Sequence, residues 1–95
     1  MKVIVIATRK QDAKPEDFAP HLEAEVKHAL SMYRDDVVRE IYSRADGKGA
    51  IIVLECNDVA HAEQLMAGLP LAAAGLLSFE FYATKPYRGI VQYAE

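Results

Sequence analysis

Three residues whose side chains can move protons or bind metal ions recur at helical spacing in the first third of the sequence. His21, Glu25 and His28 stand at positions i, i+4 and i+7, and side chains at these offsets lie one above another on a helix. Three interpretations are open. The stripe is a partly exposed helix edge with a His–Glu hydrogen bond, an acid–base site in which Glu25 is the base and a histidine relays the proton, or a zinc site. The stripe spans a long distance for one ion and shows no fourth ligand, so we expect no metal and no cofactor.

Tyr42 and Arg44 form a second candidate group. They are two residues apart in a segment that alternates as a strand, so they lie on one face of it. A guanidinium beside a phenol can bind the carboxylate of a small acid. The alternative is a solvated edge strand whose charges prevent aggregation.

The least polar stretch of the chain, GLPLAAAGLLSFEFY, raises a third possibility for binding. It is shorter than the about 20 apolar residues that span a membrane, so we expect no membrane contact. Leu69 and Pro70 begin a turn rich in small residues. This turn forms either the wall of a substrate pocket or a surface for close packing against a neighbouring subunit.

The elements that must position these residues follow from periodicity. We expect strands at residues 2–8, 37–45, 50–56 and 76–84, and a hairpin at Asp46-Gly47-Lys48-Gly49. We expect one helix from residue 15 or 16 to 34 and a second from residue 57 or 58 to Gly68. The tail, residues 86–95, is an arm on a neighbouring subunit or folds back, with 90–93 as a short extra strand. The face of the first helix that we expect to pack on the core consists of Phe18, Leu22, Val26, Ala29, Leu30 and Tyr33.

The order β-α-β-β-α-β predicts a single ferredoxin-like α+β domain over residues 1–95, with a four-stranded antiparallel sheet and two helices on one face. In this topology the first and third strands are central. Both are apolar on both sides (VIVIA and AIIVLEC), although the helices cover only one side of such a sheet. We therefore expect a second copy of the chain to cover the other side, in a homodimer or an assembly of dimers.

Charge and cysteine content restrict the class of protein further. The formal net charge is −3, and phosphate neutralisation needs clustered Lys and Arg, so we expect no nucleic-acid partner. The one cysteine, Cys56, excludes a disulfide within the chain and favours a reducing, cytoplasmic location. The opening residues MKVIVIATRK read as a strand rather than as a signal peptide.

Four segments resemble one family, the muconolactone delta-isomerases of the dimeric α+β barrel group. They are LEAEVKHAL, VVREIYSRA, IIVLECND and QLMAGLPLAAAGLLSFEFYATKPY. The resemblance implies a proton-transfer isomerase that acts on a small lactone or a related intermediate of aromatic catabolism. It places the family's base at Glu25, with His21 or His28 as its aid. The family's hairpin tyrosine and asparagine fall on Lys48 and Ala50. The alternative is a non-catalytic domain that binds a small ligand or only associates with itself.

Overall fold

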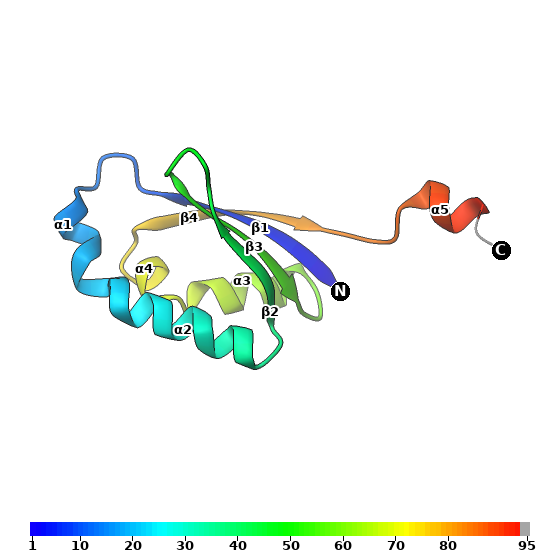
Figure 1. The fold of residues 1–95 in the computed structure, drawn as a ribbon, viewed down its shortest axis with the longest axis horizontal. Coiled ribbons are helices and arrows are strands. Elements are labelled where there is room, and N and C mark those ends of the chain that lie inside the picture. The colour runs from blue at the N-terminus through cyan, green and yellow to red at the C-terminus, as the bar shows by residue number, and fades with distance from the viewer. Residues whose placement is uncertain (94–95) are drawn as a thin grey trace.

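Four strands form one antiparallel sheet, and the helices cover one of its two faces (Figure 1). The computed structural model describes residues 1–93. The strand order is β2-β3-β1-β4, so the first and third strands are central and the sheet is open at β2 and β4. This confirms the predicted ferredoxin-like fold. The main elements are β1 (Lys2–Arg9), α2 (Leu22–Arg34), β2 (Val38–Ser43), β3 (Gly49–Glu55), α3 (Val59–Ala67) and β4 (Leu77–Ala83).

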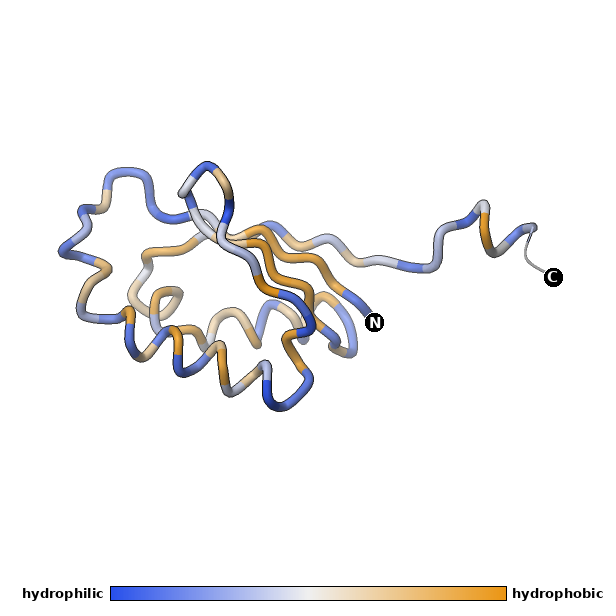
Figure 2. Tube along the Cα trace, viewed as in Figure 1, coloured by the Kyte–Doolittle hydropathy of each residue, from blue (hydrophilic) through white to orange (hydrophobic). Residues whose placement is uncertain are grey.

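The core lies between the sheet and the helices. Val3 pairs with Leu54 and Val5 with Ile52 across β1 and β3, and all four side chains are buried. Met66 of α3 is also fully buried and packs on them. Figure 2 shows this concentration of hydrophobic residues along the central strands. Burying a side chain of this size stabilises the fold by about 1.5–3 kcal/mol.

The other side of the sheet, called the open face below, carries a strip of aliphatic residues that no helix covers. Its members are Ile4, Ile6, Ile51 and Val53, which pair across β1 and β3. Tyr82 of β4 lies opposite Ile4, and Tyr42 of β2 lies opposite Ile51. Both tyrosines are about half exposed, at 55% for Tyr42 and 50% for Tyr82. The prediction that the central strands lack a polar side is confirmed.

The first helical region is not continuous, contrary to the prediction of one helix up to residue 34. A short helix, α1 (Pro15–Phe18), leads into a 3-10 turn at Ala19–His21, and α2 begins only at Leu22. Pro20 lies in the turn. Proline has no N–H to donate and its ring clashes with the carbonyl four residues earlier, so an α-helix breaks at this point.

The face of α2 that packs on the sheet also differs from the prediction. Met32 is buried and Ala29 is half-buried, but Leu22, Val26, Leu30 and Tyr33 are 41–65% exposed. The buried direction is shifted toward Glu25, Ala29 and Met32. Two of the exposed side chains, Leu22 and Val26, line an opening beside β2 instead of filling the core.

The second half of the chain contains two short helices that were not predicted. Asp58 caps α3 as expected, and its Oδ1 accepts a hydrogen bond of 2.8 Å from the backbone N–H of His61. After Gly68, a helical turn, α4 (Pro70–Ala73), replaces the predicted turn. Leu71 in this helix is buried. Cys56 is buried as well, and burial raises the pKa of its thiol.

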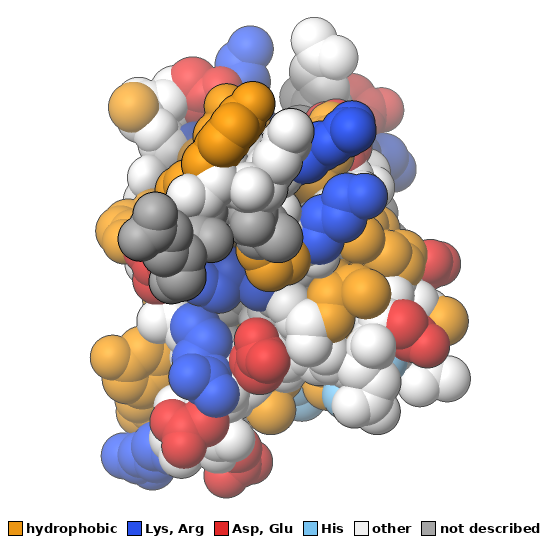
Figure 3. All heavy atoms as spheres, turned by 90° about the vertical axis from the view of Figure 1, so that its right-hand side faces the viewer, with side chains coloured by type: hydrophobic (Ala, Val, Ile, Leu, Met, Phe, Trp, Pro, Cys, Tyr) orange, Lys and Arg blue, Asp and Glu red, His pale blue; other side chains and the backbone are white. Residues whose placement is uncertain are grey.

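The C-terminal segment projects away from the sheet as an arm, residues 85–93, after Thr84, which is still hydrogen-bonded to the carbonyl of Lys2 (Figure 1). It ends in α5 (Arg88–Tyr93), so the predicted short strand at residues 90–93 is wrong. Tyr87, Ile90 and Tyr93 are 67–79% exposed. Figure 3 views the molecule from the side of the arm, where hydrophobic, basic and acidic side chains intermix. Within residues 1–93, no helix is long and apolar enough to cross a membrane.

Candidate functional site

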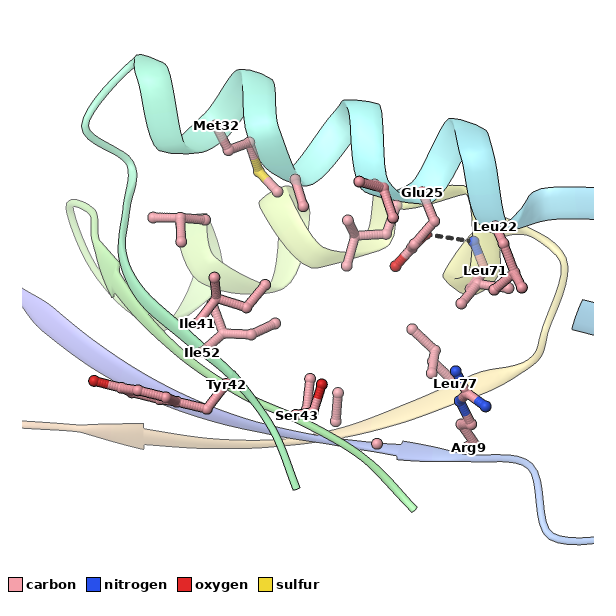
Figure 4. A pocket seen from close by; sticks show the side chains of 17 residues that line it. Arg9, Leu22, Glu25, Met32, Ile41, Tyr42, Ser43, Ile52, Leu71 and Leu77 are labelled. Carbon is pink, nitrogen blue, oxygen red and sulfur yellow. Dashed lines mark hydrogen bonds between the residues drawn. The ribbon is translucent and has the colours of Figure 1, made fainter. Parts of the chain in front are cut away.

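A cavity of about 350 Å³ lies between α2 and the helix-covered face of the sheet. Figure 4 shows the 17 residues that line it. Most of them are apolar, which is typical of a site for a small organic ligand. The polar side chains on the lining are those of Arg9, Glu25, Tyr42 and Ser43. Glu25 is thus the one carboxylate among the lining residues.

The carboxylate of Glu25 is held by the start of α4. Its Oε1 accepts a hydrogen bond of 2.9 Å from the backbone N–H of Leu71. The first N–H groups of a helix have no partner within the helix, and Pro70 before it has no N–H at all. Oε2 accepts no hydrogen bond from any group within residues 1–93. One oxygen is therefore fixed while the other is available to a ligand.

The two histidines of the predicted stripe lie outside this cavity. His28 is half-buried, and its imidazole lies beside Gly68 at the end of α3. His21 borders a separate hollow together with Asp12 and Asp17. The structure thus places the three residues on one side of the same helical region but brings only Glu25 to the cavity.

Tyr42 and Arg44 share a face of the β2 edge, as predicted, but they are engaged elsewhere. Tyr42 borders the cavity with its ring directed away from it (Figure 4), and its hydroxyl donates a hydrogen bond of 2.7 Å to Glu40. This hydrogen bond raises the pKa of the Tyr42 phenol. Arg44 is not on the lining. Its guanidinium donates to Thr8 Oγ1 over 2.8 Å and pairs with Asp46 over 2.6 Å.

The turn that follows α3 supplies one wall of the cavity. Leu69 and Leu71 are buried and line it, whereas Pro70 does not. Ala50, one of the two hairpin residues considered above, also lines it. Lys48, at the other position, lies in the hairpin outside the cavity.

One lining residue, Arg9, is absent from the sequence-based candidates. It lies across the cavity from Glu25 at the same end (Figure 4). Its guanidinium carbon sits 5.0 Å from the centre of the Phe18 ring, a cation–π geometry. The alternation of the first strand could have identified it, because Arg9 follows Val3, Val5 and Ala7 on the helix-covered side.

The site therefore combines a single carboxylate with an apolar enclosure and one guanidinium. A carboxylate placed in this way can act as a general base toward a carbon acid. Within residues 1–93, no group of three or more His, Cys, Asp and Glu side chains is arranged to hold a metal ion.

Two solved structures share this fold. The structure of muconolactone isomerase is 18% identical in sequence, with a TM-score of 0.75 over 93% of this chain and 92% of that chain. The 5-chloro-2-hydroxyhydroquinone dehydrochlorinase from Burkholderia phenoliruptrix AC1100, in complex with 2,5-dihydroxybenzoquinone, is 10% identical, with a TM-score of 0.73 over 94% of this chain and 98% of that chain. No protein-family model and no curated protein sequence matches the chain. The resemblance expected from the sequence is confirmed at the level of the fold.

Proposed function

We propose that this chain is an enzyme that moves a proton on a small, carbonyl-bearing ring compound, with Glu25 as the base. The observation that carries the proposal is the position of the Glu25 carboxylate. It is the one acidic group on the lining of an apolar cavity, and one of its oxygens is fixed by Leu71 while the other is free of protein partners.

The chemistry needs only this group and the cavity. A C–H bond next to a carbonyl is acidic enough for a carboxylate to remove its proton when the two are held in contact. The carboxylic acid so formed returns the proton to another carbon, and the double bond shifts. A cavity of about 350 Å³ lies in the range typical of small-ligand sites.

The two structural neighbours support the choice of substrate class. One is named for the isomerisation of muconolactone, and the other holds 2,5-dihydroxybenzoquinone. Both compounds are small oxygenated rings. We therefore propose a lactone or a related intermediate of aromatic catabolism as the substrate.

The proposal is tested by proton exchange in D₂O. Muconolactone and related unsaturated lactones are incubated with the protein, and deuterium incorporation is followed by NMR. The Glu25→Gln variant keeps an acceptor for the Leu71 N–H but loses the base, so we expect the exchange rate to fall by at least about 10²-fold. Glu23→Gln, an exposed carboxylate on the same helix, is the matched control and should change little.

Two other results would contradict the assignment of Glu25 as the base or the assignment of the chain as an enzyme. Wild-type exchange in the Glu25→Gln variant would refute the base assignment. Binding of ring compounds with no exchange at all would favour the alternative, a non-catalytic ligand-binding domain. The predicted relay through His21 or His28 stays a prediction, and a tenfold or greater loss of rate in either His→Gln variant would support it.

We also propose that two copies of the chain pack through their open faces. The support is the strip of Ile4, Ile6, Ile51 and Val53, which the helices leave uncovered. Within one copy Val53 is already buried and Ile51 is 37% exposed, while Tyr42 and Tyr82 beside them are about half exposed. Association would therefore remove the remaining exposed apolar surface of this face from water, which is favourable by about 25 cal/mol per Å². The cytoplasmic location stays a prediction that rests on the single Cys56.

A further inference from the structure

A second hollow, called the basic cleft below, adjoins the cavity at Arg9. It has a volume of about 660 Å³ and shares Arg9 and Leu22 with the cavity. The end of β1, the loop that follows it, α1 and the β2–β3 hairpin surround it. Its lining includes four basic side chains and no acidic one: Arg9, Lys10, Arg44 and Lys48.

Three of these four cations make no salt bridge within residues 1–93, although Lys48 lies close enough to Asp46 to lower its pKa. Arg44 is paired with Asp46, whereas no carboxylate within the described part of the chain comes within 4.0 Å of the charged nitrogens of Arg9, Lys10 or Lys48. The chain as a whole carries a net charge of −3, so this cluster of basic side chains differs in sign from the net charge of the protein. Asp46 offsets part of this positive charge. The remaining like charges repel one another, and an anion bound between them relieves that repulsion.

Backbone contacts hold the basic residues in place. The N–H of Arg9 donates to the carbonyl of Lys48 over 2.8 Å, which joins the hairpin to the end of β1. The N–H of Lys10 donates to the carbonyl of Leu76 over 2.9 Å. The Phe18 ring supports the guanidinium of Arg9 without occupying its hydrogen-bonding edge. The backbone that carries these cations is therefore held in place, which reduces the conformational entropy lost when an anion binds.

We infer that the basic cleft binds an anionic group that carries more than one negative charge, a phosphate or a pair of carboxylates. Three unpaired cations match such a group better than a single carboxylate. This inference deepens the proposed function and rests on it for one point, that the anionic group belongs to the substrate whose ring lies against Glu25. Arg9 then contacts the substrate at the junction of the two hollows and determines specificity.

The test measures anion binding at constant ionic strength, so that general screening does not change. The ¹⁵N-labelled full chain is titrated at pH 8 with inorganic phosphate, succinate or acetate, with NaCl adjusted in compensation. We expect saturable shifts of the backbone amides of residues 9–11 and 46–49 with phosphate or succinate, and at least fivefold weaker binding of acetate. Whichever of the first two binds more tightly identifies the group as phosphate or dicarboxylate.

Variants locate the site. Lys48→Gln and Arg9→Gln should each weaken anion binding about tenfold, as expected for loss of one charge-assisted hydrogen bond. Lys85→Gln, which removes a lysine from the C-terminal arm, is the matched control and should change nothing. Lys48 is exposed in a hairpin, so its variant should retain the fold, which the dispersion of the amide spectrum will verify.

The outcomes separate this inference from the proposed function. A chain that binds phosphate or succinate in the basic cleft but exchanges no lactone protons would refute only the enzyme. Three results would overturn the basic cleft: no saturable shift with any anion, acetate binding as tightly as the dianions, or an equal loss in the Lys85→Gln variant.

Discussion

The carboxylate of Glu25 and the backbone N–H of Leu71 are joined by a 2.9 Å hydrogen bond although 46 positions separate them in the sequence. The bond ties α2 to the first turn of α4. It fulfils two needs at once, because it satisfies a helix-start N–H that has no partner within the helix and it fixes the orientation of the acid in the cavity. The position of the candidate base thus depends on the turn that follows α3.

This bond leads to a prediction about stability. In Glu25→Ala the partly buried N–H of Leu71 loses its acceptor, and we expect the free energy of unfolding to fall by about 1–2 kcal/mol relative to Glu25→Gln, which retains one. Urea denaturation followed by circular dichroism measures the difference. Equal stability of the two variants would mean that water replaces the carboxylate without loss.

A second prediction concerns the close approach of the hairpin to β1. Gly49 has φ = +155°, and a Cβ added there would overlap the carbonyl oxygen of Ala7. We expect Gly49→Ala to lower the free energy of unfolding by at least about 3 kcal/mol. Gly47→Ala is the control, because Gly47 also has a positive φ, +74°, but faces open space, so its cost should be about 1 kcal/mol. Similar thermal midpoints for the two variants would contradict the prediction.

The proposed packing of open faces predicts the oligomeric state. Sedimentation equilibrium should give twice the 10.5 kDa of one chain. Ile51→Lys places a charge in the middle of the proposed interface, and this variant should sediment as a single folded chain, because Ile51 is already 37% exposed in the isolated subunit. Leu30→Lys, at an exposed apolar residue of α2, is the control and should leave the dimer intact. A wild-type chain that sediments as a monomer at micromolar concentration would refute the proposal.

A fourth prediction concerns pH and the hairpin. The backbone N–H of Lys48, together with the Arg44 guanidinium, lowers the pKa of Asp46. A lowered pKa means that the ionised form stabilises the fold. This contribution to stability is fully present above the ordinary pKa of an aspartate, and it is lost as the pH falls through the lowered pKa of Asp46. An NMR titration of the Asp46 carboxyl should show the lowering, and Arg44→Gln should abolish only part of it, because the Lys48 N–H remains. Titration of wild-type Asp46 in the ordinary range would contradict this account.

The strands and their order could be predicted from the sequence, because alternation and apolar content reflect burial directly. The β-α-β-β-α-β order predicted that the first and third strands are central, and their apolar composition on both sides agreed with it. Glu25 was a candidate from its place on the flank of the first helix and from the family resemblance, but the sequence did not show that it lines a cavity.

What the sequence did not predict depends on contacts between distant segments. The break at Pro20 was visible, but the apolar spacing of Leu22 and Val26 suggested a continuous buried face. Their exposure follows from the way α2 sits above a cavity rather than on a filled core. The alternation of β1 places Arg9 on the helix-covered side, but its contact with the site also depends on the pairing of β1 with β4 and on the position of Phe18.

The six residues of α5 are too few to sustain a helix in water by their own hydrogen bonds. Whether it stays helical in a dilute sample therefore depends on the contacts that Ile90 and Tyr93 make. If self-association provides these contacts, the helix content measured by far-ultraviolet circular dichroism should rise with protein concentration. The rise should be absent when residues 86–95 are removed, and the folding of α5 would then report self-association.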